Sequence, residues 1–99
     1  MFQLWKRLRS ALAYKIKLTV TAEKELAKLD KQVVVRIIKF LRERLSVSDK
    51  PKSLGKQLAG SMCQFWRFRV GDYRIICDIQ DDELIILALK IGHRKEVYK

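Results

Sequence analysis

Three arginines stand close together in the stretch WRFRVGDYR, residues 66–74. A Gly-Asp pair separates two alternating runs there, as in a β-hairpin with a two-residue loop of the II′ kind. Side chains alternate along a strand, so this hairpin would place Arg67, Arg69 and Arg74 on one face, with Arg69 directly opposite Arg74. Three permanently charged guanidinium groups on one face are suited to clamp the phosphates of a polyanion. The alternative is that each reaches a separate carboxylate, such as Asp72 or Asp78, or extends into solvent.

The end of the chain supplies further candidates in the stretch GHRKEVYK, residues 92–99. Arg94 would add a fourth cation, and Tyr98 would stack on an unpaired base. The alternative for Tyr98 is packing at the rim of the sheet. His93 is the sole histidine, the residue type used most often as a general acid or base. A lone histidine is usually a surface residue, so His93 is a secondary catalytic candidate.

The segments that would position these residues begin with a strand and two helices. Residues 14–19, YKIKLT, alternate strictly and predict a half-buried strand. Apolar residues at helical spacing over 21–46 predict a helical hairpin. Its short first helix would be capped by Thr21 and end near residue 29, and its longer second helix would be capped by Asp30 and extend to about residue 45.

The second half of the chain is expected to form a sheet. Residues 46–61 are polar, include the single proline and predict a loop that carries Lys50, Lys52 and Lys56. Residues 63–91 predict an antiparallel meander with turns at 71–72 and 81–82. One face of its first two strands is continuously apolar and should receive the helices, which gives an α+β fold with the helices on one face of the sheet.

The charge balance favours a polyanionic partner, an acidic protein partner, or both. The 99 residues include 22 Lys and Arg against 11 Asp and Glu, a formal net charge of +11. Hydrophobic residues make up 48%, which is enough for a folded core and argues against disorder. The length allows one domain and excludes a two-domain enzyme with a cleft between two cores.

Several other classes of protein are excluded by what the sequence lacks. Cys63 and Cys77 are too few for a disulfide scaffold and lie in apolar runs, so we expect buried thiols in a reduced, cytoplasmic protein. One histidine and no pair of CxxC motifs make a zinc site unexpected, and we expect no metal, cofactor or small-molecule ligand. No apolar run approaches the ~20 residues of a membrane span, so no membrane partner is expected. Residues 1–13 are interpreted as a basic extension before a domain at 14–99. The alternative is an amphipathic helix that touches RNA, membrane or a partner.

The order of these features resembles the RelE/ParE superfamily of toxins from bacterial toxin–antitoxin pairs, and the RelE branch most closely. The resemblance covers residues 14–98. It rests on the strand, the helical hairpin, the loop sequence QLAG at 57–60, the stretch WRFR…GDYR and the ending GHR…VY.

The resemblance implies a cytoplasmic toxin that enters the ribosomal A site and cuts mRNA. Arg67 and Arg69 stand where RelE has two basic active-site residues, commonly lysines. Arg74 and Arg94 match its two arginines, and Tyr98 matches the tyrosine that stacks on the mRNA. RNA would supply its own nucleophile, the 2′-hydroxyl, and the loop lysines Lys50, Lys52 and Lys56 are expected to bind the RNA.

The sequence departs from the family pattern at the loop and the strand. Ala59 stands where relatives often have a basic residue, and arginines replace both strand lysines. An arginine stays protonated and is a poor general base. His93, Tyr98 or a ribosomal group would then have to accept the proton, which makes dependence on the ribosome an expectation.

The resemblance also implies an acidic antitoxin, encoded alongside, that wraps the domain. An amphipathic helix of that partner would cover an apolar area expected on the arginine face, formed by Ile76, Ile85, Leu87 and Leu89. Two other functions stay open. A ParE-type relative would inhibit DNA gyrase without cutting RNA, and a basic adaptor would bind nucleic acid without chemistry.

Overall fold

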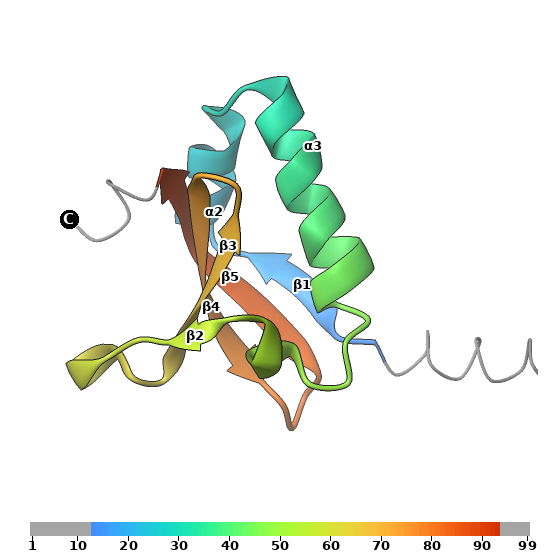
Figure 1. Ribbon diagram of the computed structural model, residues 1–99, viewed down its shortest axis with the longest axis vertical. Coiled ribbons are helices and arrows are strands. Elements are labelled where there is room, and N and C mark those ends of the chain that lie inside the picture. The colour runs from blue at the N-terminus through green and yellow to red at the C-terminus, as the bar shows by residue number, and fades with distance from the viewer. Residues whose placement is uncertain (1–12, 94–99) are drawn as a thin grey trace, which may run out of the picture.

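The structure, a computed structural model, describes residues 13–93 (Figure 1). A five-stranded sheet carries two helices on one of its faces. The predicted α+β arrangement is therefore confirmed. The elements are β1 (Lys15–Leu18), α2 (Val20–Ala27), α3 (Lys31–Phe40) with a π-helical continuation (Leu41–Leu45), a 3₁₀ turn (Pro51–Leu54), β2 (Lys56–Gln57), a second 3₁₀ turn (Gly60–Met62), β3 (Phe65–Val70), β4 (Tyr73–Gln80) and β5 (Ile85–His93).

The strands are ordered β1-β5-β4-β3-β2. β3, β4 and β5 form the predicted antiparallel meander. The first strand adds to it in parallel, with Lys15 beside Ile85 and Leu18 beside Ala88. At the other edge, β2 pairs with Trp66 and Arg67 of β3. The sheet is therefore mixed, and part of the predicted loop is an edge strand.

The helical hairpin forms as predicted, but its first cap is Thr19 and the prediction of Thr21 was wrong. The Thr19 hydroxyl accepts a hydrogen bond from the Ala22 amide at 3.0 Å and donates one to the Leu89 carbonyl at 3.0 Å. This residue thus fixes the start of α2 on β5, an anchor that Thr21 does not provide. α3 starts after Asp30, whose side chain makes no capping hydrogen bond.

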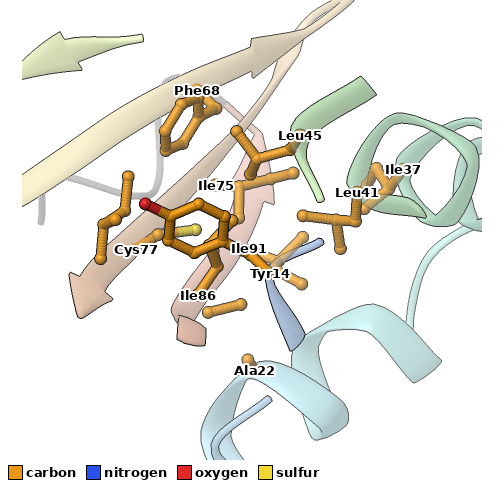
Figure 2. Close-up of a cluster of buried hydrophobic side chains, with 12 residues drawn as sticks. Tyr14, Ala22, Ile37, Leu41, Leu45, Phe68, Ile75, Cys77, Ile86 and Ile91 are labelled. Carbon is orange, nitrogen blue, oxygen red and sulfur yellow. The ribbon is translucent and has the colours of Figure 1, made fainter. Parts of the chain in front are cut away.

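The core lies between the helices and the apolar face of the sheet (Figure 2). Ile37 and Leu41 extend from the second helix toward Ile75 of β4, and all three are fully buried. Cys77 belongs to this core, and burial, with a smaller effect of Asp78, raises the pKa of its thiol to about 12. The prediction that both cysteines are buried was wrong for Cys63, because it follows the second 3₁₀ turn at the surface. Within residues 13–93, no helix is long and apolar enough to cross a membrane.

Candidate nucleic-acid interface

The hairpin between β3 and β4 has the predicted two-residue loop and register. Val70 pairs with Tyr73, and Arg69 pairs with Arg74. Gly71 has φ of +60°, and Leu84 is the one non-glycine residue with positive φ in the described part of the chain, so Asp72 has negative φ. A glycine with positive φ followed by a residue with negative φ is the II′ pattern, which follows the twist of the strands.

The three strand arginines line one hollow of about 320 Å³, here called the arginine hollow. Lys56 lines it too, because β2 places this lysine opposite Arg67. The remaining wall is the end of the first 3₁₀ turn, residues 53–55. The structure therefore brings together four cations that the sequence separates by up to 18 residues (74 − 56).

The loop reaches the arginine strand at Gly55. A Cβ at this position would lie 2.4 Å from the carbonyl oxygen of Arg67 and 2.7 Å from the ring of Phe68. Real Cβ atoms do not come that close, so a side chain here would force the loop away from β3. The absence of a side chain at Gly55 thus allows Lys56 to join the arginines.

The arginines of the hollow differ in exposure. Arg69 is exposed and its Nε donates to the Gly71 carbonyl at 3.1 Å. It forms no ion pair with any residue in 13–93, so the carboxylate alternative does not hold for this arginine. Arg67 and Arg74 are half-buried, and the Nε of Arg74 is fully buried. The carboxylate of Asp78 accepts a hydrogen bond from Gln80 at 3.2 Å.

Further cations lie on the same face of the sheet, opposite the helices. The strand register puts Lys15 and Lys17 of β1 beside Ile85 and Leu87, and Lys90 opposite Ile76. This basic face comprises Lys15, Lys17, Lys56, Arg67, Arg69, Arg74 and Lys90. Such a face attracts polyanions over a long range, and added salt weakens this attraction.

The predicted apolar area on this face is only partly present. Ile85 and Leu87 are half-buried there, but the expectation of an uncovered Ile76 was wrong, since this side chain is only 3% exposed. Leu89 falls at a β-bulge, because Ile76 pairs with Lys90 while Cys77 pairs with Ala88. The bulge leaves Leu89 without a partner in the register.

Lys50 and Lys52, two predicted RNA contacts, lie at a different hollow of about 400 Å³. The amine of Lys52 is 3.0 Å from a carboxylate oxygen of Asp81 and lies 5.8 Å from the centre of the Trp66 ring. Of the three loop lysines, the structure brings only Lys56 to the arginines.

Asp81 joins three segments that are far apart in the sequence, its own turn and those of Tyr14 and Lys52. Its other carboxylate oxygen accepts a hydrogen bond from the Tyr14 hydroxyl at 2.7 Å. Burial and this bond raise the pKa of Tyr14 to about 12, and the bonds from Tyr14 and Lys52 lower the pKa of Asp81. No local pattern signals a contact between residues 67 positions apart.

His93 lies on the helix face of the sheet. It pairs with Tyr73, which packs on the core, and the two rings meet edge to face with 5.7 Å between their centres. Arg74 projects to the opposite face, beside Gly92. The structure therefore separates His93 from the arginine hollow. Arg94, Tyr98 and residues 1–12 lie outside the described residues.

Solved structures share this architecture of a mixed sheet with two helices on one face. A chain of the toxin–antitoxin complex RelBE2 from Mycobacterium tuberculosis has a TM-score of 0.77 at 27% identity, over 85% of this chain and 94% of that one. The isolated E. coli RelE toxin has a TM-score of 0.66 at 27% identity, over 87% and 92% of the two chains. The fold is that of the RelE-like toxins.

Sequence comparison identifies the family itself. A family model described as the ParE toxin of type II toxin–antitoxin system, parDE, matches residues 16–98. The chain belongs to this toxin family, within the RelE/ParE superfamily that the sequence analysis expected. It is also 27% identical to toxin RelG of Mycobacterium tuberculosis over 88 residues, which span 89% of this chain and 99% of that toxin.

Proposed function

We propose that this toxin is a ribosome-dependent endoribonuclease that cuts mRNA in the A site and thereby inhibits translation. The observation that carries the proposal is the arginine hollow, where Arg67, Arg69 and Arg74 line one cavity together with Lys56. Arginines that face each other across a hairpin repel in the free protein, and a phosphate between them offsets the repulsion.

The reaction uses a nucleophile that the RNA supplies. The 2′-oxygen attacks the adjacent phosphorus, the bond from phosphorus to the 5′-oxygen breaks, and the leaving 5′-oxygen takes up a proton from solvent. The products are a 2′,3′-cyclic phosphate and a 5′-hydroxyl. Arg74 binds the scissile phosphate, Arg69 stabilises the side of the leaving oxygen, and Arg67 holds the neighbouring backbone. Their contribution is orientation of the RNA and stabilisation of charge that develops in the transition state.

The proton of the 2′-hydroxyl needs an acceptor. The arginines stay protonated, and His93 lies on the other face of the sheet. The arginines and His93 therefore do not supply the base. Tyr98 or a group of the ribosome fills this role in the proposal. A base supplied by the ribosome would make free RNA a poor substrate.

Arg74→Ala tests the proposal in cell-free translation, with cleavage mapped by primer extension on the mRNA. We expect cleavage to be lost while the melting temperature stays unchanged or rises slightly, because Arg69 no longer faces a like charge. Arg42→Ala is the matched control, an exposed arginine that does not line the hollow. A large fall in the melting temperature of Arg74→Ala would show that Arg74 is a structural residue, and it would refute the proposed phosphate clamp.

A second candidate function is inhibition of DNA gyrase through protein contacts, without RNA cleavage. The description of the matching family model, a ParE toxin, favours it. A gyrase supercoiling assay, run beside the translation assay with the same preparation, separates the two. Inhibited supercoiling with uncut mRNA would establish the gyrase function.

The partner that would silence the toxin is an acidic antitoxin encoded beside it, and the place of action is the cytoplasm. The net charge of +11 favours an acidic partner, and a similar structure comes from a toxin–antitoxin complex. Co-purification with the product of the neighbouring reading frame tests this. A toxin that accumulates alone at a high level without harm to the cell would count against it.

A further inference from the structure

Another hollow of about 370 Å³ lies between α3 with its π-helical continuation and the β3–β4 hairpin, here called the α3 groove. Arg36, Phe40 and Arg44 follow one another at helical spacing of four and face the hairpin as one stripe. Lys39 and Glu43 form the adjacent row. Arg69 lines the groove from the side of the sheet.

The groove follows the part of β3 that β2 leaves open. Among residues 13–93, β2 pairs only with Trp66 and Arg67, and the loop at Gly55 lies against Phe68, so no strand runs beside Arg69 and Val70 at the outer edge of β3. The floor is apolar, because Phe40 and Val70 line it, and Phe40 is held against the buried Phe68 with 6.1 Å between ring centres. Phe40 itself is half-buried.

The rim of the groove is strongly cationic. The groove is lined by a single carboxylate, Glu43, and by four cations, Arg36, Lys39, Arg44 and Arg69. None of these four cations forms an ion pair with a residue in 13–93. A guanidinium nitrogen of Arg36 is 3.9 Å from the position of a Cβ built on Gly71, whose carbonyl accepts from Arg69. Two arginines thus lie at one hairpin tip, where an anionic ligand would offset their repulsion.

We propose that the α3 groove binds the phosphate backbone of single-stranded RNA that extends beyond the arginine hollow. Arg69 lines both hollows, so the two form one cationic path around the hairpin tip. An aromatic floor beside cations is the usual platform for unpaired nucleotides. This continuity favours RNA over a separate acidic protein, and the inference depends on the proposed function of the arginine hollow.

The test measures binding of the full chain to two fluorescent single-stranded oligoribonucleotides across a salt series. One has about three nucleotides and fills only the arginine hollow, and the other has about twelve and reaches the α3 groove. The groove variant is Arg36→Gln with Arg44→Gln. The control, Lys24→Gln with Arg42→Gln, removes the same charge from exposed residues that line neither hollow, one of them close to the groove positions in sequence.

The groove variant should weaken binding of the long RNA alone. Each phosphate contact contributes about 0.7 to the slope of log affinity against log salt for a single strand, so two lost contacts lower the slope by about 1.4. The expected loss is about 25-fold at about 0.1 M salt, and it disappears near 1 M. The short RNA should bind equally to all three proteins.

Equal binding of the long RNA by the groove variant and the control would overturn the inference, whether or not the wild type cuts mRNA. Cleavage on programmed ribosomes is measured in parallel, and its absence in the wild type would remove the proposed function while the slope difference still stands. A groove variant that binds both RNAs like the control, but no longer binds the antitoxin, would assign the groove to an acidic protein and also overturn the inference.

Discussion

Replacement of Gly55 by alanine tests how closely the loop must approach the arginine strand. Gly55 has an extended backbone with φ of −132°, a conformation that alanine adopts without strain. The new methyl group would lie 2.4 Å from the Arg67 carbonyl oxygen and 2.7 Å from the Phe68 ring. Neither neighbour can yield, since the carbonyl belongs to a paired strand and Phe68 is fully buried. The loop must therefore retreat by about 1 Å to reach ordinary contact.

The retreat should affect both stability and activity. Overpacking of this kind costs about 1–3 kcal/mol, and each kcal/mol lowers the melting temperature of a domain this small by about 4–8 °C. Lys56 follows Gly55 directly and would move away from Arg67. A displacement of about 1 Å in a site that acts by positioning can cost about 10²-fold in rate.

Gly60→Ala is the control for the loss of stability. Gly60 has φ of +70°, so alanine there is strained by about 1 kcal/mol, but its Cβ would meet nothing within 4 Å and the loop at Lys56 would stay in place. The assays are thermal unfolding and mRNA cleavage at a temperature where all three proteins are folded. Wild-type melting and cleavage in Gly55→Ala would refute the reasoning, and so would an equal loss of cleavage in both variants.

Three further predictions concern the rest of the molecule. His93→Gln should reduce the single-turnover cleavage rate only a few-fold and leave its pH profile unchanged, whereas loss of a general base would cost about 10²–10⁴-fold and remove an inflection near neutral pH. Asp81→Asn should lower the melting temperature at neutral pH, and wild type and variant should converge in acid. The pKa of Asp81 is lowered from its ordinary 3.8 by Tyr14 and Lys52, so its contribution is complete above that pH and is lost as the pH falls through the lowered value. Deletion of residues 1–12 should leave cleavage on programmed ribosomes unchanged, because the residues that line the arginine hollow lie within 53–74; a large loss would give this segment a role in the site.

The faces of the sheet were predictable because alternation is a local property of a strand. The Gly71-Asp72 loop fixed the register, and the register placed Arg67, Arg69 and Arg74 together. The buried partners of these arginines along the strands, Phe68 and Ile75, followed from the same period of two. The helical hairpin followed in the same way from its own period.

The features that escaped prediction depend on contacts between distant segments. Lys52 was expected at the RNA, but it lies at a carboxylate 29 residues further along the chain (81 − 52). Thr19 caps the first helix because it also reaches β5, which a capping pattern alone does not reveal. The α3 groove is formed by a stripe of helix residues and an open strand edge. The sequence of either segment does not show that the two lie side by side.

If the proposed function holds, the facing arginines of the β3–β4 hairpin weaken the fold through their repulsion and also bind the substrate. Natural sheets avoid like charges in opposed positions, so Arg69 and Arg74 are a point of local frustration in an otherwise consistent sequence. Ionic strength should then act on the molecule in two opposite directions. Added salt screens the repulsion and steadies the free protein, while it loosens the hold on a polyanion. Any anion that occupies the hairpin favours the folded chain by mass action, so binding and folding of this toxin are coupled through one pair of side chains.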